Sequence, residues 1–321
     1  MRLTRRAAAA AFSFAPLIAR SQTRYPDRPI RVTVPFGAGG LADVTVRIVG
    51  DRLTQRLGQQ IVVVNQPGAA GALAARGATS APADGYTLTL LTNGTAVSVA
   101  TTRALGFDPL ADFTPISTLG LFDFVVATSR EHPYRTFQDV RDAAQKTPGR
   151  LNIGTIQFGS TQHLAAVLLR ALAGLDLTIV PFRTTPDAMT GLIRRDVDVV
   201  IDGFSAMGAM IRDGQLRALA TTGSRRGAAL PDIPTMIESG VAGYDVTSWN
   251  GLFAPTAVPR EVIERLNAEL KSVLSEPSIV TRLADLGIEA RSSTTAELGA
   301  RLRDDISRWT KVAEQAGLEK Q

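Results

Sequence analysis

Residues 30–58, IRVTVPFGAGGLADVTVRIVGDRLTQRLG, join a strand to a helix through a glycine-rich turn. Residues 30–34 are rich in β-branched side chains, which favour a strand, and residues 35–40 contain three glycines. The apolar residues that follow recur with the 3.6-residue period of a helix and end at Gly58; they are Leu41, Val44, Ile48, Val49, Leu53 and Leu57. A strand that passes into a helix in this way begins a βαβ unit, so the stretch predicts an α/β fold.

Strand-like and helix-like segments keep alternating along most of the chain. Further strands are expected at residues 61–64, 87–91, 124–127, 151–154, 178–180, 197–201 and 216–220. A helix of small residues is expected at 69–79, a capping box marks a helix start at Thr136, and Thr185 is placed as a cap before Pro186. This order predicts largely parallel sheets with helices on both faces.

From Pro259 onward the pattern changes. Residues 259–275, 277–286 and 294–316 all have helical periodicity, and we expect no strand among them. Because helices alone form no sheet, this tail is expected to cover a sheet that is built earlier in the chain. One domain would then be discontinuous in sequence.

The first 21 residues have the features of an export signal. Residues 1–6 are basic, and residues 7–19 form an apolar stretch of 13 residues, shorter than the about 20 that a membrane span needs. Small residues at positions 19 and 21 predict cleavage after Ser21, and Arg5-Arg6 leaves both the Sec and the twin-arginine (Tat) route open. We therefore expect export to the periplasm; the alternative is a buried N-terminal helix.

Charge and composition exclude several classes of function. The 321 residues include 35 Lys and Arg against 30 Asp and Glu, but four Arg lie in residues 1–21, which leaves 31 against 30 in the rest. Because basic and acidic residues are nearly equal in number after residue 21, the charge argues against nucleic-acid binding. The chain has no Cys, two His and no nucleotide-binding or G-x-S-x-G motif, so we expect no metal, no cofactor and no enzymatic activity.

Two glycine-rich turns are the strongest candidates for a binding site. The first comprises Phe36, Gly37, Ala38, Gly39 and Gly40, and the second is centred on Phe158, Gly159 and Ser160. Each follows a strand and precedes a helix, where free backbone N–H groups and the helix dipole favour an anion. The alternative for either turn is a purely geometric role, but two such turns in separate parts of the chain predict a cleft between them.

Polar residues near the strand ends are further candidates. Asp43 falls in the first turn of the expected helix, where the dipole favours an acid with or without a role in a site. His163 follows Ser160 by three residues, which places it near the same helix start. Asp202 follows the strand at 197–201 and is expected to face the cleft, whereas Trp249 and Phe253 are expected to pack in the core or at a hinge.

A series of short motifs runs through the chain in a fixed order. It includes YPDRPIR at 25–31, VPFGAGGLAD at 34–43, LGQQIVVVNQPGA at 57–69, DGYTL at 84–88, GSTQHLA at 159–165, PDIPT at 231–235 and SWNGLFAP at 248–255. Taken together they resemble the Bug family, the solute-binding receptors associated with tripartite tricarboxylate transporters. Two places depart from the family pattern. Gly37-Ala38 stands where proline is frequent, and PFRT at 181–184 stands where Pro-Tyr-Lys-Gly is frequent.

The resemblance implies a two-lobed α/β fold of the periplasmic-binding-protein (Venus flytrap) type. Lobe one would comprise residues 22–123 and 246–321, and lobe two would comprise residues 124–245. The ligand would be a small carboxylate held mainly by backbone N–H groups and hydroxyls. By position, the implied contacts are Phe36, Gly37, Ala38, Gly39, Gly40, Leu41 and Asp43 on lobe one, Phe158, Gly159, Ser160, Thr161 and His163 on lobe two, and Asn93, Thr95, Asp202 and Phe204 at further strand ends.

Several alternatives remain open at this point. Arg183 is either a charged fork for a second carboxylate or a solvated surface residue. The expected function is a monomeric receptor that delivers its ligand to membrane transporter subunits; a receptor that reports to a membrane sensor protein and an enzyme on a bilobal scaffold are the alternatives. Dicarboxylates, tricarboxylates, amino acids and aromatic acids all remain candidate ligands.

Overall fold

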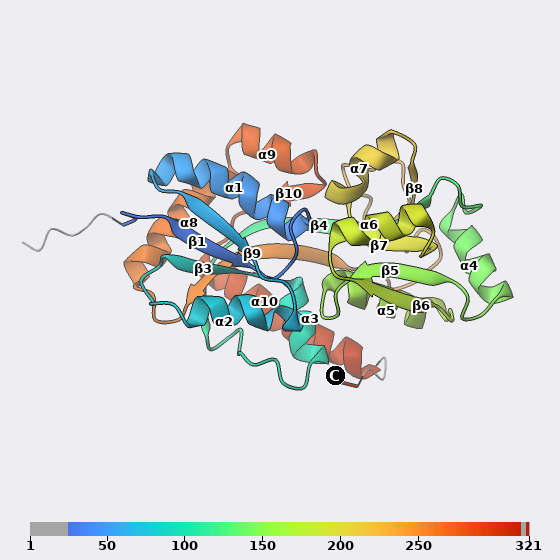
Figure 1. Cartoon of the computed structure of the whole chain (residues 1–321), viewed down its shortest axis with the longest axis horizontal. Coiled ribbons are helices and arrows are strands. Elements are labelled where there is room, and N and C mark those ends of the chain that lie inside the picture. The colour runs from blue at the N-terminus through green and yellow to red at the C-terminus, as the bar shows by residue number, and fades with distance from the viewer. Residues whose placement is uncertain (1–24, 316–318, 321) are drawn as a thin grey trace, which may run out of the picture.

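The computed structural model describes residues 25–315 and 319–320, so the expected export signal at 1–21 lies outside the described residues. Two halves lie side by side (Figure 1). The long strand β4 (Phe113–Ser129) runs through both halves, and β9 (Thr247–Pro255) leads from the second half back into the first. No helix in the described ranges is long and apolar enough to cross a membrane.

The first half is built on a sheet with strand order β2-β1-β3-β9-β4. The bounds of its further strands are β1 (Ile30–Val34), β2 (Ile61–Asn65), β3 (Thr87–Thr92) and β10 (Ile288–Ala290), which also pairs with β4. Strand β1 is parallel to both β2 and β3, whereas β9 is antiparallel to β3 and to β4. The turn after β1 therefore opens at the same sheet edge as the ends of β2 and β3.

The second half is built on a sheet with strand order β4-β7-β5-β6, and β8 also pairs with β4. Its strands are β5 (Asn152–Ile156), β6 (Thr178–Phe182), β7 (Val199–Gly203) and β8 (Leu216–Thr221). Strand β5 is parallel to β6 and β7, whereas β7 and β8 are antiparallel to β4. The carboxyl ends of β5, β6 and β7 meet at one edge, which faces the first half.

Strand β4 is common to both sheets. Its residues up to Asp123 pair with β9, and those from Phe124 to Ser129 pair with β7 and β8. The strand expected at 124–127 is therefore the end of a much longer one. The sheets are mixed rather than largely parallel, because local β-α-β order does not fix the direction of strands such as β9 that return from far along the chain.

Helices cover both faces of the sheets (Figure 1). In the first half α1 (Leu41–Leu57), α8 (Arg260–Leu274) and α9 (Pro277–Ala284) lie on one side, and α2 (Ala72–Thr79), α3 (Asn93–Thr101) and α10 (Thr295–Gln315) on the other, with a 3-10 turn η1 at Ala69–Gly71. In the second half α6 (Thr185–Arg194) and α7 (Phe204–Arg212) lie on one side and α5 (Thr161–Ala173) on the other, with α4 (Phe137–Lys146) at the outer end.

The helix ends follow local sequence signals in most cases. Gly58 ends α1 with a left-handed φ of 69°, which glycine adopts without strain. The capping box expected at Thr136 is present at the start of α4. At α6 the prediction is wrong by one residue: the cap is Thr184, whose side chain accepts a hydrogen bond from the amide of Asp187, and Thr185 is the first helical residue. Two consecutive threonines before Pro186 gave two equivalent candidates.

The C-terminal helices cover the first sheet as expected, but the tail is not free of strands. Strand β10 pairs with residues Gly120–Phe122 of β4, which contradicts the expectation of a helical tail. Three residues are too short for a period to be recognised, and the pairing depends on β4 rather than on the local sequence. Helix α10 packs on α3 and β4 and buries Leu298, Leu302 and Trp309.

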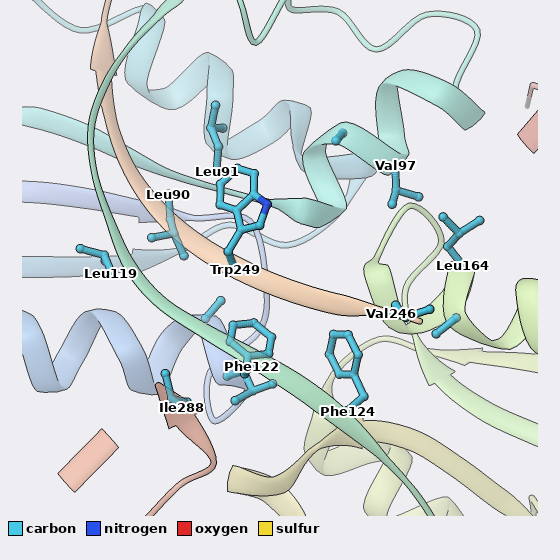
Figure 2. Packing of buried hydrophobic residues seen from close by; sticks show 14 of the residues in the cluster. Leu90, Leu91, Val97, Leu119, Phe122, Phe124, Leu164, Val246, Trp249 and Ile288 are labelled. Atoms are coloured by element: carbon cyan, nitrogen blue, oxygen red, sulfur yellow. The ribbon is translucent and has the colours of Figure 1, made fainter. Parts of the chain in front are cut away.

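The core continues across the junction between the halves (Figure 2). Phe122 and Phe124 lie on β4 where it passes from one sheet to the other, and Trp249 lies on the neighbouring β9. Trp249 and Phe253 are buried, which confirms that they are packing residues, and the indole of Trp249 donates to Asp305 Oδ2 at 2.6 Å. The strands that join the halves are therefore fixed by aromatic packing.

Candidate functional site

A cavity lies between the two halves; the space not filled by protein atoms, open solvent included, is about 460 Å³. Its floor is formed by the crossing strands, and its walls by helix N-termini from both halves. The lining residues are Phe36, Gly37, Gly40, Leu41, Ala42, Thr92, Phe122, Phe124, Ile156, Thr161, Gln162, Arg183, Thr184, Thr185, Ser248 and Asn250.

The N-terminus of α1 forms one wall. Its cap residue, Gly40, has extended backbone angles and supplies no side-chain hydrogen bond to the helix. The amides of the first helical turn have no acceptor within the helix, because no preceding turn exists. The amides of Leu41 and Ala42, both of which line the cavity, are therefore available donors.

Asp43 stabilises this turn from behind and does not line the cavity. Its carboxylate accepts hydrogen bonds from the Gly39 amide at 3.0 Å, from Asn65 Nδ2 at 3.0 Å and from Arg47 Nε at 2.9 Å. Burial opposes ionisation, but these bonds from Arg47, Gly39 and Asn65 outweigh it and hold the pKa of Asp43 below its ordinary value. A stable carboxylate thus keeps the glycine-rich turn in one conformation.

The N-terminus of α5 forms the facing wall. The hydroxyl of Ser160 caps the helix by accepting from the His163 amide at 3.1 Å, which leaves the amides of Thr161 and Gln162 without an intrahelical acceptor. The Thr161 hydroxyl donates to Asn93 Oδ1 of the first half at 3.3 Å and lies 3.4 Å from the Ser248 hydroxyl. This wall is therefore in direct contact with the other half.

The N-terminus of α6 supplies a third wall. Thr184 caps the helix, Pro186 has no N–H group, and the Thr185 amide is left as the free donor. Arg183 precedes the helix, lines the cavity and is exposed. The Thr-Thr-Pro signal predicted this helix start, with the cap one residue late, but only Arg183 was predicted to belong to the site.

The electrostatic character of the cavity follows from these three helix starts. Each N-terminus carries a partial positive charge, and the guanidinium of Arg183 adds a full one. Among the described residues, no Asp or Glu lines the cavity. The apolar part of the lining, with Phe36, Phe122 and Phe124, fits a short carbon skeleton. The arrangement suits a small anion with an apolar body.

Asp202 lies behind two of the walls and is fully buried. Its Oδ1 accepts from Gln162 Nε2 at 2.9 Å and from the Gly203 amide at 2.7 Å, and its Oδ2 accepts from the Thr185 hydroxyl at 2.8 Å. Burial raises the pKa of Asp202 against the opposing effect of these hydrogen bonds. Since Gln162 lies in the first turn of α5 and Thr185 begins α6, this carboxyl group fixes the two helix starts relative to each other.

The two halves are in contact around the cavity. Gln157 Nε2 donates to the carbonyl of Pro35 at 3.0 Å. The Ser98 hydroxyl lies 2.9 Å from the carbonyl of Gly94 in its own helix and 3.2 Å from the carbonyl of Gly159 in the other half. These contacts connect the two glycine-rich turns to the opposite half. The two halves therefore meet directly beside the cavity.

The structure brings only some of the expected site residues to the cavity. Six line it, namely Phe36, Gly37, Gly40, Leu41, Thr161 and Arg183. Eight others do not line a described cavity, namely Ala38, Gly39, Asp43, Asn93, Thr95, Ser160, Asp202 and Phe204. Of these, Asn93, Thr95, Ser160 and Asp202 form hydrogen bonds with residues that do.

Phe158, Gly159 and His163 line a separate cavity of about 310 Å³ between α3 and α5. The ring of His163 lies 5.2 Å from that of Phe158, and its Nδ1 is 3.4 Å from the Thr155 hydroxyl. Burial and, to a smaller extent, Arg170 lower the pKa of His163, so the neutral ring is favoured. His163 is thus a packing residue next to the second turn.

Four of the lining residues that were not predicted from the sequence lie on the two crossing strands. Phe122 and Phe124 come from β4, and Ser248 and Asn250 from β9. No local motif distinguishes them, because their place in the site depends on how two distant strands pair. Within the described part of the chain, no three His, Asp or Glu side chains are grouped so as to hold a metal ion.

Comparison with known proteins finds a matching family model and several similar solved structures. A family model described as the tripartite tricarboxylate transporter family receptor matches residues 45–318. The structure of the periplasmic binding protein BugD is 29% identical, with a TM-score of 0.88 over 92% of this chain and 100% of that one. Rpa4515 of R. palustris with adipate is 31% identical, with a TM-score of 0.88 over 92% and 100%. MatC of Rhodopseudomonas palustris with bound malate is 32% identical, with a TM-score of 0.84 over 90% and 99%.

Proposed function

Because the chain belongs to the family of tripartite tricarboxylate transporter receptors, we propose that it binds a small carboxylate and delivers it to a membrane transporter. The family consists of periplasmic binding proteins rather than enzymes. The solved relatives hold adipate in one case and malate in another. A carboxylate of similar size is therefore the first class of ligand to test on this chain.

One observation carries the proposal: three helix N-termini converge on a cavity that has no acidic lining among the described residues. The amides of Leu41, Thr161 and Thr185 come from α1, α5 and α6, and each is free of an intrahelical acceptor. A carboxylate has several lone pairs and can accept from donors on more than one wall. A ligand without acceptor oxygens would leave this set of donors unpaired, and a cation would be repelled by the partial charges of the helix N-termini.

The proposed mechanism is ligand-linked closure. We assign residues 22–123 and 246–321 to one lobe and residues 124–245 to the other, with the crossings in β4 and just before β9. A carboxylate that contacts α1 on one lobe and α5 and α6 on the other bridges the two and favours the closed state. No bond in the ligand is made or broken.

We further propose that the protein acts as a periplasmic monomer. The basic and apolar leader at 1–21 supports export, by the Sec or the Tat route. The transporter as partner is implied by the family. In the closed form the ligand is largely covered, so the transporter would have to recognise the shape of the closed protein rather than the ligand itself.

A thermal-shift screen with isothermal titration of the positive compounds tests the proposed function. Purified protein, dialysed free of bound acids, is mixed with C4 to C6 mono-, di- and tricarboxylates and with the methyl ester of each. Ligand at about 100 times its dissociation constant should stabilise the folded protein by roughly 2.7 kcal/mol, which is readily visible as a shift in Tm. The esters should give no shift, because they lose the charge that the helix N-termini bind.

Two further observations separate binding from catalysis. The acid should be recovered unchanged after prolonged incubation, as mass spectrometry of the denatured protein would show. Stabilisation by nucleotides or metal ions in place of acids would contradict the proposal, as would equal stabilisation by acids and esters.

A further inference from the structure

Asn250 is a buried amide in the floor of the cavity. It lies on β9, is 1% exposed and lines the cavity together with the N-terminus of α1. Its Nδ2 donates to the Thr45 hydroxyl oxygen at 2.9 Å and approaches the carbonyl of Leu41 at 3.5 Å. Both partners belong to α1, on one side of the amide.

The orientation of this amide is fixed by the proton of Thr45. The Thr45 hydroxyl donates its single proton to the carbonyl of Leu41 at 2.6 Å. Its oxygen can then only accept a hydrogen bond from Asn250, so the group that faces Thr45 must be the NH₂ rather than the carbonyl oxygen. The Oδ1 of Asn250 is thereby directed away from α1.

Asn250 Oδ1 is a buried acceptor with no hydrogen-bond partner among the residues that the structure describes. Buried polar atoms are nearly always paired, and an unpaired one destabilises the protein. The helix amides and Arg183 differ from it in kind, because they are donors that match a carboxylate. An ionised carboxylate only accepts hydrogen bonds, so a carboxylate group cannot donate one to Oδ1.

We propose that the ligand is a hydroxycarboxylate whose hydroxyl group donates to Asn250 Oδ1. This inference rests on the proposed function and specifies the ligand class of the same site. An ammonium group would also be a donor, but the cavity has three helix N-termini, one guanidinium and no acidic lining among the described residues, which disfavours a second positive charge. A neutral hydroxyl avoids this penalty.

Matched ligands test the proposal on the unmodified protein. Titration calorimetry compares succinate, malate and methoxysuccinate, and adipate, 2-hydroxyadipate and 2-methoxyadipate as a longer set. In at least one set, the hydroxy acid should bind about tenfold or more tightly than its unsubstituted parent, because the parent leaves Oδ1 unpaired. The methoxy acid, which keeps the oxygen but lacks the proton, should lose this advantage.

Two variants test whether the preference for the hydroxy acid depends on Asn250. Asn250→Leu removes the acceptor and should bring the affinity ratio of hydroxy to unsubstituted acid close to one. Asn267→Leu is the matched control, since Asn267 donates to Ile116 O and Ser293 O in the first half and does not line the cavity. It should leave the ratio unchanged. If Asn250→Leu does not fold, the ligand sets on the unmodified protein decide the question alone.

The outcomes distinguish the inference from the proposed function. If acids bind but the hydroxy, methoxy and unsubstituted forms bind equally, the ligand does not donate to Asn250 Oδ1 and the inference is wrong, whereas the proposed function stands. If an amino acid binds better than the hydroxy acid of the same length, the choice of hydroxyl is wrong. If no carboxylate in either set or in the wider screen binds, both the inference and the proposed function fail.

Discussion

A methyl group built on Gly37 would lie 2.6 Å from Cγ2 of Thr184, which belongs to the other half of the molecule. The two residues face each other across the rim of the cavity. Thr184 has little freedom to move away, because its hydroxyl caps α6 and also contacts Asp187 Oδ2 at 2.7 Å. The absence of a side chain at position 37 is therefore a condition for closure.

Gly37→Ala should weaken ligand binding roughly tenfold or more, with little change in the Tm of the unliganded protein. The clash is specific to the closed arrangement and is of the size of a typical overpacking cost, about 1–3 kcal/mol. Titration calorimetry with the best acid from the screen measures the loss. Adding Thr184→Ser removes Cγ2 but keeps the capping hydroxyl, so the double variant should regain affinity. Failure of this rescue would mean that the contact does not limit closure.

The buried carboxyl group of Asp202 leads to a second prediction. Asp202→Ala should lower the free energy of unfolding by about 1–3 kcal/mol and weaken binding, because Gln162 Nε2, the Thr185 hydroxyl and the Gly203 amide lose their acceptor. Denaturant unfolding and calorimetry measure the two effects. Asp202→Asn keeps one oxygen for Gln162 and Gly203 and presents an NH₂ group to the Thr185 oxygen, so it should be much milder. Equal damage by both variants would contradict this role.

The parts of the fold that could be predicted are those with strong local signals. The strand Ile30–Val34 and the helix Leu41–Leu57 follow from β-branched residues, a 3.6-residue period and a terminating glycine. Both signals are complete within a short window, although α1 also packs on α8 and α9 from the C-terminal part of the chain. The same holds for the capping box at Thr136.

The crossing strands could not be predicted in full for physical reasons. Strand β4 is buried on both faces over much of its length and contains Pro115 and Gly120, so it has neither alternation nor an unbroken β-branched run. Its partners β9 and β10 come from far along the chain. The glycine-rich turns were recognisable as helix starts, but the floor of the site, with Phe124 and Asn250, depends on this long-range pairing.

Asp123 gives a prediction on pH dependence. It lies where β4 passes between the halves, near Asp245 and Glu289 with Arg225 as the opposing charge. Burial first, and then the charge of Asp245, raise the pKa of Asp123 from 3.8 to about 6. The folded state then binds this proton more tightly than the unfolded state. The contribution of the protonated group to stability is complete below pH ~4 and is lost as the pH rises through about 6.

Asp123→Asn should therefore raise the Tm at pH 7 and flatten the change in stability between pH ~4 and about 6.5. The free energy of unfolding, measured by denaturant titration at several pH values, is the direct readout. Asp232→Asn is the control, because Asp232 is exposed and its replacement should leave the profile of the unmodified protein intact. An unchanged profile in Asp123→Asn would assign the titration to another group.

Arg183 tests whether the cavity discriminates by ligand charge. Arg183 lines the cavity beside the N-terminus of α6, and its side chain is exposed. If the helix amides hold the first carboxylate, Arg183 is the cation within reach of a second. Arg183→Gln should then weaken the binding of a dicarboxylate by about 5- to 10-fold and that of a monocarboxylate of equal length by less than about 2-fold, since an exposed ion pair adds only about 1 kcal/mol.

Raising the salt concentration should reduce this difference between the two acids. Arg194→Gln, at the other end of α6, changes the net charge equally and should affect neither ligand. An equal loss for both acids would place Arg183 at the first carboxylate, and no loss would make it a solvated residue of the rim.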